Sequence, residues 1–418
     1  MRERHYDVAV IGAGAAGLAA ALEVQRHGFS CALLEREHHL GGILMQCIHN
    51  GFGLQEFKRE LTGPEFAEEF IDQLADSGVD VYLDTTVGGI EESEVGKEIY
   101  CYSLNGGITR LNVGAVVLAM GCRERNRGNI GTPGTRPAGV FTAGLAQRLV
   151  NVEGYIPGKD VVIVGSGDIG LIMARRMTWV GSRVHAVVEI QPYPSGLTRN
   201  IVQCLNDFDI PLYLSHIVSR IEGKNRVERV LVTPLANGLP DYDSSFEIAC
   251  DTLLLSVGLI PENELSQEAG VQLNPQTGGP LVDSTMMTSV NGIFACGNVL
   301  HVHDLADYVA EEARRAGAYA SAWLKGYAPA LQIGVKAGPN VRYVNPAMMN
   351  PEQPDRLYLR SLIVRNNAML VLKLDNNVVK QKKLSHVQPS EMVSIRLTQR
   401  DVADWNVSRQ SVLEVSIK

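Results

Sequence analysis

The sequence predicts an α/β protein with two parallel-sheet units, the first of them discontinuous, followed by a small antiparallel β-domain. Three observations predict this fold. A strand, a glycine turn and a helix follow one another twice, at residues 6–26 and 160–180. The 418-residue chain has a globular composition, with 45% hydrophobic and 20% charged residues. After Gly338 the chain holds no further glycine, and apolar and polar residues alternate.

The first unit begins with an apolar, β-branched run at residues 6–11, typical of a buried parallel strand. Gly12-Ala-Gly14-Ala-Ala-Gly17 follows, then a helix to about Arg26 and a second strand that ends at Glu35. In such a turn the first glycine allows the sharp bend, the second lets a pyrophosphate approach the backbone, and the third lets helix and strand pack closely. An acid at the end of the second strand accepts hydrogen bonds from ribose hydroxyls, so the unit predicts a Rossmann-like dinucleotide site.

The second unit repeats this order. A strand at 160–164 runs into Gly165-Ser-Gly167-Asp168-Ile169-Gly170, then a helix to about Val180 and a strand at 183–188 that ends at Glu189. A carboxylate at this position repels a 2′-phosphate, which favours NAD(H) over NADP(H). Arg199 keeps NADP(H) open as the alternative.

The remaining elements follow from local patterns. We expect a helix at 64–77, β-rich chain at 79–109, strands at 113–119, 227–233, 252–257 and 292–295, and a helix at 304–325. The glycine- and proline-rich segment 128–139 is interpreted as a linker. Strands within 357–374 and 391–397 are expected to turn at Asn366-Asn367 and Asn376-Asn377. The predicted domains are 1–125 with 259–330, then 126–258, then 331–418.

Two dinucleotide sites in one chain imply two redox cofactors. Over about residues 5–325 the sequence resembles the two-dinucleotide-domain flavoprotein oxidoreductases, the pyridine nucleotide-disulfide oxidoreductase-like family of glutathione and thioredoxin reductases. The resemblance implies FAD at the first glycine turn and a nicotinamide coenzyme at the second. Asn298 stands where the family has an aspartate that holds the flavin ribityl chain. The implied cofactor-binding residues are Gly12, Gly14, Ala15, Ala16, Gly17, Glu35, Arg36, Gly41, Gly42, Ala119, Gly121, Gly165, Gly167, Asp168, Ile169, Gly170, Glu189, Gly258, Gly297 and Asn298.

Three further segments narrow the resemblance. Residues 41–53, 61–66 and 297–304 are similar to the flavoproteins found with anaerobic glycerol-3-phosphate dehydrogenases, and more distantly to the larger subunits of opine oxidases and hydrogen cyanide synthase. This likeness implies a partner dehydrogenase or electron-carrier subunit. Disulfide reductases of this fold need two cysteines near the flavin, but Cys47 stands alone there and the chain has no CxxC pair. Disulfide reduction is therefore not expected.

The sequence thus predicts an FAD-dependent NAD(H) oxidoreductase that moves a hydride between NADH and flavin and exchanges electrons with a partner protein in glycerol-3-phosphate metabolism. One alternative is direct oxidation of an amino acid or opine at the flavin. That reaction needs a carboxylate clamp, for which Arg123, Arg125 and Arg127 are the nearest basic cluster. The other alternative is a non-catalytic, flavin-bound assembly subunit.

No side chain is required as acid or base for hydride transfer, so catalytic residues are only candidates. Cys47 is either a redox-active thiol or a small buried side chain, and His49 lies in a glycine-flanked loop. His303 precedes a helix that we expect Asp304 to cap, where it could add to the positive charge at the flavin. Cys296 is expected to serve packing. Four charged residues of that helix are expected on a solvated face: Glu311, Glu312, Arg314 and Arg315.

Composition excludes other classes. The formal net charge of −8 gives no general attraction to nucleic acid. We expect no transmembrane segment and no signal peptide, and the scattered cysteines fit a reducing cytoplasm. No cysteine or histidine spacing predicts a metal site. An oligomer is expected.

Overall fold

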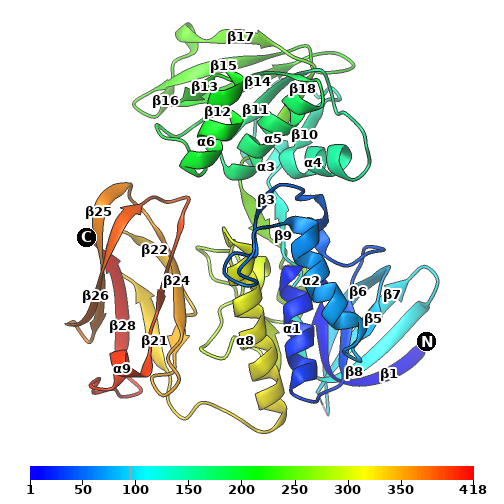
Figure 1. The fold of residues 1–418 in the computed structure, drawn as a ribbon, viewed down its shortest axis with the longest axis vertical. Coiled ribbons are helices and arrows are strands. Elements are labelled where there is room, and N and C mark those ends of the chain that lie inside the picture. Colours follow the sequence, from blue (N-terminus) through cyan, green and yellow to red (C-terminus); the bar gives the residue numbers. More distant parts are fainter. Residues whose placement is uncertain (95) are drawn as a thin grey trace. The chain divides into compact units, whose positions relative to one another are not determined.

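The computed structural model describes residues 1–94 and 96–418. The chain forms two compact units, Met1–Cys122 with Pro261–Lys418, and Arg123–Ile260. It passes between them within β9 (Cys122–Glu124) and β19 (Leu259–Pro261). Figure 1 shows the helices and strands of the chain.

A mostly parallel sheet forms the centre of the first unit. Its strands follow the order β5-β2-β1-β8-β7-β6, and β20 pairs with the carboxyl end of β8. The bounds are β1 (Arg2–Ile11), β2 (Cys31–Leu34), β5 (Asp80–Tyr82), β6 (Thr85–Ser93), β7 (Gly96–Ser103), β8 (Gly107–Leu118) and β20 (Ile293–Ala295). Helices α1 (Ala15–Arg26) and α8 (Ala306–Leu324) pack against each other beside this sheet (Figure 1). Apolar side chains of strands and helices together form one core.

Shorter elements complete this part of the chain. Helix α2 (Gly63–Ala75) begins where Thr62 and Glu65 form a reciprocal cap with Pro64 in the first turn, which confirms the helix expected there. The others are β3 (Asn50–Phe52), β4 (Leu61–Thr62) and α7 (Glu264–Glu268). Among the described residues, no helix is both long and apolar enough to cross a bilayer.

The second unit has a five-stranded parallel sheet in the order β10-β18-β11-β12-β13. Its strands are β10 (Val140–Thr142), β11 (Asp160–Val164), β12 (Arg183–Glu189), β13 (Leu212–Leu214) and β18 (Thr252–Leu255). Helices α4 (Ala143–Asn151), α5 (Asp168–Trp179) and α6 (Thr198–Cys204) connect or flank them. An antiparallel layer adds β14 (His216–Glu222), β15 (Arg229–Ala236), β16 (Leu239–Pro240) and β17 (Phe246–Ala249).

The interpretation of residues 128–139 as a linker was wrong. Helix α3 (Arg127–Ile130) starts this segment, capped by the Asn126 side chain. Gly134 and Ala138 then form bridges to Ile221 and Arg226 of the second unit. The segment therefore belongs to the body of that unit.

Residues 331–418 are β-rich, with their own apolar core. One sheet has the order β23-β21-β28-β25-β26 and another β22-β24-β27. The bounds are β21 (Ile333–Ala337), β22 (Val341–Asn345), β23 (Met348–Met349), β24 (Arg356–Ser361), β25 (Arg365–Leu374), β26 (Asn377–Val387), β27 (Met392–Arg396), α9 (Gln399–Val402) and β28 (Val412–Ile417). The turn expected at Asn376-Asn377 lies one residue earlier, at Asp375-Asn376, which both have positive φ, and Asn377 begins β26. The turn expected at Asn366-Asn367 is wrong, because both residues lie inside β25. Because these residues cluster with the first unit, the three-domain division stays a prediction.

Candidate functional site

The first glycine turn lies between the carboxyl end of β1 and the start of α1. Gly12 has φ +97°, and an added Cβ would lie 2.5 Å from the Ala119 carbonyl oxygen. A Cβ on Gly17 would lie 1.6 Å from the Gly12 oxygen. A Cβ on Gly14 would meet nothing within 4 Å, and no side chain caps α1. The outer glycines thus serve packing, while Gly14 leaves an open approach to a helix N-terminus, which suits a phosphate.

The acid predicted beside this turn is held in place by backbone groups. Glu35 is buried at the end of β2. Its Oε2 accepts the Ala13 N–H at 2.7 Å, and its Oε1 accepts the Glu37 N–H at 2.9 Å. Each oxygen keeps a lone pair for a further donor, such as a ribose hydroxyl. Gly41 donates its N–H to the Ala13 oxygen at 2.9 Å, which draws the next loop against the turn.

The second unit reproduces the same arrangement. A Cβ on Gly165 would lie 2.0 Å from the Ser256 oxygen, whereas one on Gly167 would have its nearest neighbour 3.9 Å away. The Glu189 Oε2 accepts the Ser166 N–H at 2.9 Å and its Oγ–H at 2.6 Å. The Oε1 accepts the Gln191 N–H at 2.9 Å. In both units the acid therefore binds the residue after the first glycine and the residue two positions after itself.

The other predicted residues of this unit lie around its glycine turn. The Asp168 Oδ1 accepts the Leu197 N–H at 2.9 Å and the Asn200 Nδ2–H at 2.7 Å, which ties the loop after β12 to the start of α5. Ile169 packs against the apolar core. Gly258 has φ +98°, and its carbonyl oxygen accepts the Arg125 N–H at 3.0 Å.

The late turn meets the first glycine turn in space. A Cβ on Gly297 would lie 2.8 Å from the Ala16 Cβ. The Asn298 Oδ1 accepts the His303 N–H at 3.0 Å, and its Nδ2 donates to the Cys122 Sγ at 3.6 Å. Asn298 thus orders the loop between this turn and α8. Segments nearly 300 residues apart in the sequence are adjacent here because β20 pairs with β8.

The remaining predicted residues of the first unit have simple placements. Ala119 and Gly121 follow β8, and Gly121 has φ +75° with open space at its Cβ position. Gly42 has φ +53°, and its Cβ would lie 3.1 Å from the Gly14 Cα. Ala15 starts α1. Arg36 is exposed.

Sequence reasoning missed a buried cluster of two histidines and a glutamate. Glu312 on α8 accepts His301 Nε2–H at 3.0 Å, His303 Nε2–H at 3.2 Å and the Gly297 N–H at 2.6 Å. Asn345 Nδ2 lies 3.4 Å from the Glu312 Oε2. The side chains of the two histidines and of Glu312 are at most 2% exposed. The cluster ties the late glycine turn to α8 and to the β-rich C-terminal residues.

Burial and the neighbouring rings set the charges of this cluster. Burial and then His303 lower the pKa of His301 to about 4, so this ring is neutral at pH 7. Burial alone would raise the pKa of Glu312, but His303, His301 and their hydrogen bonds outweigh it and hold it far below its usual value. The ligand atoms of the three side chains lie within 4.8 Å of one another, so these residues could hold a metal ion. The Glu312 carboxylate already accepts hydrogen bonds from four donors, so it does not need a metal ion.

The structure corrects two expectations about this helix. The helix face is only partly solvated, because Glu312 is buried, while Arg314 pairs with Glu56 and Glu311 pairs with Arg356. Arg315 likewise donates to the Ser284 oxygen at 3.1 Å. The His303 ring is buried and its Nε2 lies 3.2 Å from the Glu312 carboxylate, and a role for His303 at the flavin stays a prediction. Asp304 does not cap α8, whose N-cap is Leu305. The i, i+3 spacing of charges predicted a solvent-exposed face, but these side chains bind partners that lie far away in the sequence.

Asp304 and Asp307 have other partners. Asp304 binds Arg360 and the Met392 N–H, which joins the loop before α8 to the C-terminal strands. Asp307 in the first turn of α8 accepts the N–H groups of Gly53, Gln55 and Glu56 at 2.8–3.2 Å. The sequence analysis did not predict the contact of Asp307 with this loop. The only signal in the sequence was the glycine content of residues 41–53.

The other candidate side chains have simple placements. Cys47 is 6% exposed, and burial raises the pKa of its thiol to about 12, so it packs as a small apolar group. Cys296 is fully buried, and burial raises its pKa as well. The His49 ring packs on Phe52, with ring centroids 5.2 Å apart. Of the three arginines considered for a carboxylate clamp, Arg127 lines a pocket within the second unit.

With this geometry in place, comparison with known proteins is decisive. The family model described as pyridine nucleotide-disulphide oxidoreductase matches residues 6–320. The chain belongs to this family. Its members bind FAD and NAD(P)H, and the chain is an oxidoreductase that uses these cofactors. The open Gly14 and Gly167 positions, each with its anchored acid, fit two dinucleotides.

Individual relatives show how far the likeness extends. A thioredoxin reductase of Treponema pallidum is 26% identical over 302 residues, 71% of this chain and 90% of that protein. An opine oxidase polypeptide of Agrobacterium tumefaciens is 26% identical over 70% of this chain, which spans 61% of that protein. The T. acidophilum thioredoxin reductase structure has a TM-score of 0.64 and 25% identity over 76% of this chain and 98% of that one.

Proposed function

We propose that this protein is an FAD-dependent NAD(H) oxidoreductase that exchanges electrons with a partner protein, in a system that oxidises glycerol 3-phosphate. The duplicated glycine turn and anchored acid carry this proposal, because each prepares one dinucleotide site. When bound, FAD supplies the hydride chemistry and releases electrons singly or in pairs. The protein's own residues position the two cofactors through backbone N–H groups, helix ends and carboxylates.

Glu189 supports NAD(H) as the coenzyme. Its carboxylate is buried and receives three N–H or O–H donors from Ser166 and Gln191, so it stays fixed at the end of β12. A 2′-phosphate placed there would meet a negative charge that cannot move away. A ribose hydroxyl would instead donate to it.

The cysteines support a partner-linked electron path rather than dithiol exchange. Cys47 and Cys296 are buried, with raised thiol pKa values, and the sequence holds no CxxC pair. Similar proteins include ones named as subunits, of an opine oxidase and of a hydrogen cyanide synthase. These two observations favour a partner that accepts or supplies the electrons. The glycerol-3-phosphate link rests on the resemblance of residues 41–53, 61–66 and 297–304.

We infer that the cofactor-binding residues are those that line the two glycine turns and their neighbouring loops. For FAD they are Gly12, Gly14, Ala15, Ala16, Gly17, Glu35, Arg36, Gly41, Gly42, Ala119, Gly121, Gly297 and Asn298. For the nicotinamide coenzyme they are Gly165, Gly167, Asp168, Ile169, Gly170, Glu189 and Gly258.

Anaerobic titration of the FAD-loaded protein with NADH tests the proposal. We expect the visible flavin absorbance to bleach with NADH and, at equal concentration, much less with NADPH. Gly14→Ala and Gly167→Ala are matched variants, because neither added Cβ would meet an atom closer than 3.9 Å. Gly14→Ala should purify without FAD, and Gly167→Ala should keep FAD but need at least about tenfold more NADH. A wild-type protein that binds FAD and is not bleached by NADH would refute the proposal.

The second candidate is direct oxidation of an amino acid or opine. Two relatives named as opine oxidase polypeptides favour it, as does the position of Arg127 in a pocket. Bleaching by octopine or proline without NADH would support it. If neither NADH nor such a substrate bleaches the flavin, the protein is better described as a flavin-bound assembly component.

A further inference from the structure

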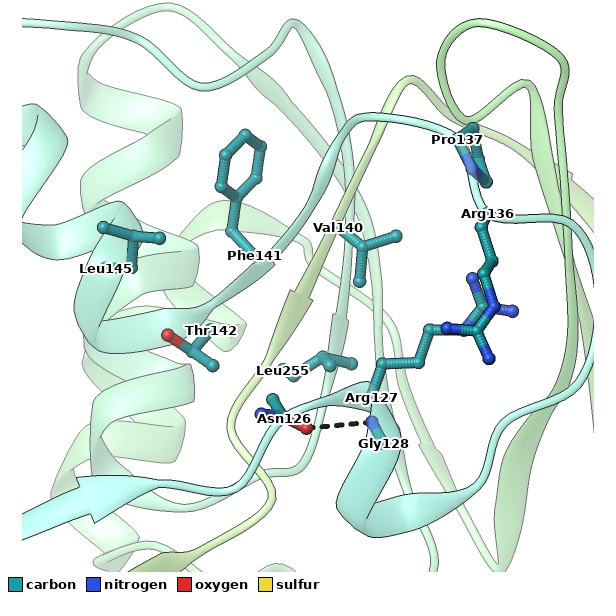
Figure 2. Close-up of a pocket in the computed structure, with 10 residues that line it drawn as sticks. All are labelled: Asn126, Arg127, Gly128, Arg136, Pro137, Val140, Phe141, Thr142, Leu145 and Leu255. Atoms are coloured by element: carbon teal, nitrogen blue, oxygen red, sulfur yellow. Dashed lines mark hydrogen bonds between the residues drawn. The ribbon is translucent and has the colours of Figure 1, made fainter.

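A pocket of about 370 Å³ lies in the second unit, separate from the residues of its glycine turn. Its lining comes from the segment around α3, from β10 and the start of α4, and from the end of β18 (Figure 2). One wall is apolar and is made by Val140, Phe141, Leu145 and Leu255. The volume is at the lower end of that of small-molecule sites.

The other wall carries two arginines. Figure 2 shows the side chains of Arg127 and Arg136 running toward the same place, where their guanidinium groups overlap in the view. Arg127 is held in place, since its Nε–H donates to the Thr132 oxygen at 3.1 Å and its Nη1 to the Thr135 oxygen at 2.5 Å. Within residues 1–94 and 96–418, no carboxylate lines the pocket and none forms an ion pair with either guanidinium.

Two like charges held near each other repel, and an oxyanion bound to both would relieve that repulsion. Burial lowers the pKa of Arg127, and the positive charge of Arg136 nearby lowers it further. Both carbonyl partners of Arg127 are backbone atoms and carry no full negative charge. A bound oxyanion would receive the remaining N–H groups of both guanidiniums, in the bidentate manner that arginine favours.

We propose that this pocket binds a small organic oxyanion, either a phosphate monoester or a carboxylate. The carbon skeleton of this ligand lies on the apolar wall described above. The pocket is distinct from the place where Glu189 would bind the ribose of the coenzyme. In the sheet order β10-β18-β11-β12-β13, the pocket lies at β10 and β18, whereas Glu189 ends β12 on the other side of β11. The ligand is therefore not the 2′-phosphate of NADP(H). The proposal does not depend on which protein exchanges electrons with the flavin.

Calorimetric titration of the full-length, FAD-loaded protein tests it, with inorganic phosphate, glycerol 3-phosphate and succinate as probes at constant ionic strength. We expect glycerol 3-phosphate or succinate to bind one per chain, and more tightly than inorganic phosphate, which cannot use the apolar wall. Comparing the two organic probes distinguishes a phosphate ligand from a carboxylate ligand.

The variant chosen is Arg136→Gln, because Arg136 is exposed and forms no hydrogen bond within the described part of the chain, so folding should be unaffected. It should raise the dissociation constant at least about tenfold. Arg183→Gln is the matched control, since this exposed arginine lies on β12 of the same unit and outside the pocket. Leu145→Asp, at a 47%-exposed position, places a negative charge in the pocket and should abolish binding while FAD is retained.

Three results would overturn the proposal. The first is that none of the three probes binds. The second is an equal loss in Arg136→Gln and Arg183→Gln, which would mean general charge attraction only. The third is complete displacement of the bound probe by saturating NADH, which would assign the pocket to the coenzyme. Bleaching of the flavin by NADH is measured separately, so failure here leaves the proposed function standing.

Discussion

Substitution of Glu312 tests the buried cluster most directly. Glu312→Gln keeps the shape of the side chain but replaces one carboxylate oxygen with an NH₂ group. In one orientation that NH₂ faces the Gly297 N–H and His303 Nε2–H, which cannot both become acceptors. In the other it faces His301 Nε2 and Asn345 Nδ2. The His301 ring can change tautomer because the Tyr343 hydroxyl lies 3.4 Å from its Nδ1, and the Asn345 amide can turn its oxygen toward the new NH₂. The second orientation is therefore expected.

The magnitude follows from the hydrogen bonds that remain. Hydrogen bonds to a charged group contribute about 1.5–3 kcal/mol and neutral ones about 0.5–1.5 kcal/mol. Loss of the charge weakens the bonds from Gly297 and His303, and the tautomer change costs part of a third. We expect Glu312→Gln to destabilise the first unit by about 2–4 kcal/mol. At about 2–3 °C per kcal/mol for a unit of this size, its unfolding midpoint falls by about 4–12 °C.

Differential scanning calorimetry at neutral pH measures this change, with Glu311→Gln as the control. Glu311 is the preceding residue on the same helix, and its pair with Arg356 at 2.9 Å leaves the Glu311 side chain 38% exposed. Exposed pairs contribute less than about 1 kcal/mol, so the control should shift by about 3 °C or less. Equal midpoints for the two variants would refute the account of Glu312 as the anchor of the cluster.

Three other measurements follow from the structure. The folded state holds His301 neutral to about pH 4, whereas the unfolded chain takes up its proton below about pH 6.5, so stability should fall by about 3 kcal/mol as the pH drops between these values. Thermal midpoints against pH should show this slope in wild type and lose most of it in His301→Gln. Gly17→Ala places its Cβ 1.6 Å from the Gly12 oxygen, so we expect a loss of at least about 3 kcal/mol and little soluble protein, in contrast to a folded Gly14→Ala. Cys47→Ala should lower the free energy of unfolding by about 1–2 kcal/mol and leave the rate of flavin bleaching by NADH unchanged. If NADH no longer reduced the flavin of this variant, the Cys47 thiol would have a redox role.

The sequence predicted what depends on short stretches of chain. The two glycine turns, their helices and their terminal acids are specified within about 30 residues each, because glycine geometry and strand-end polarity are local properties. The hairpin at Asp375-Asn376 is local in the same sense. The sequence did not reveal that segment 128–139 packs against the second unit. Glycines are common both in linkers and where two backbone segments approach closely, so composition alone does not distinguish the two.

By itself the sequence determined the α/β class, the duplicated dinucleotide units and the absence of a CxxC dithiol, all of which follow from residue type and spacing. Only the tertiary structure decided that Glu312 is a buried hydrogen-bond centre and not a surface charge, and that Arg127 meets Arg136 at a pocket. The physical reason is that the free energy of a charged side chain depends on which groups replace its water. For Glu312 those groups come from the turn after β20, from the loop before α8 and from β22, far apart along the chain.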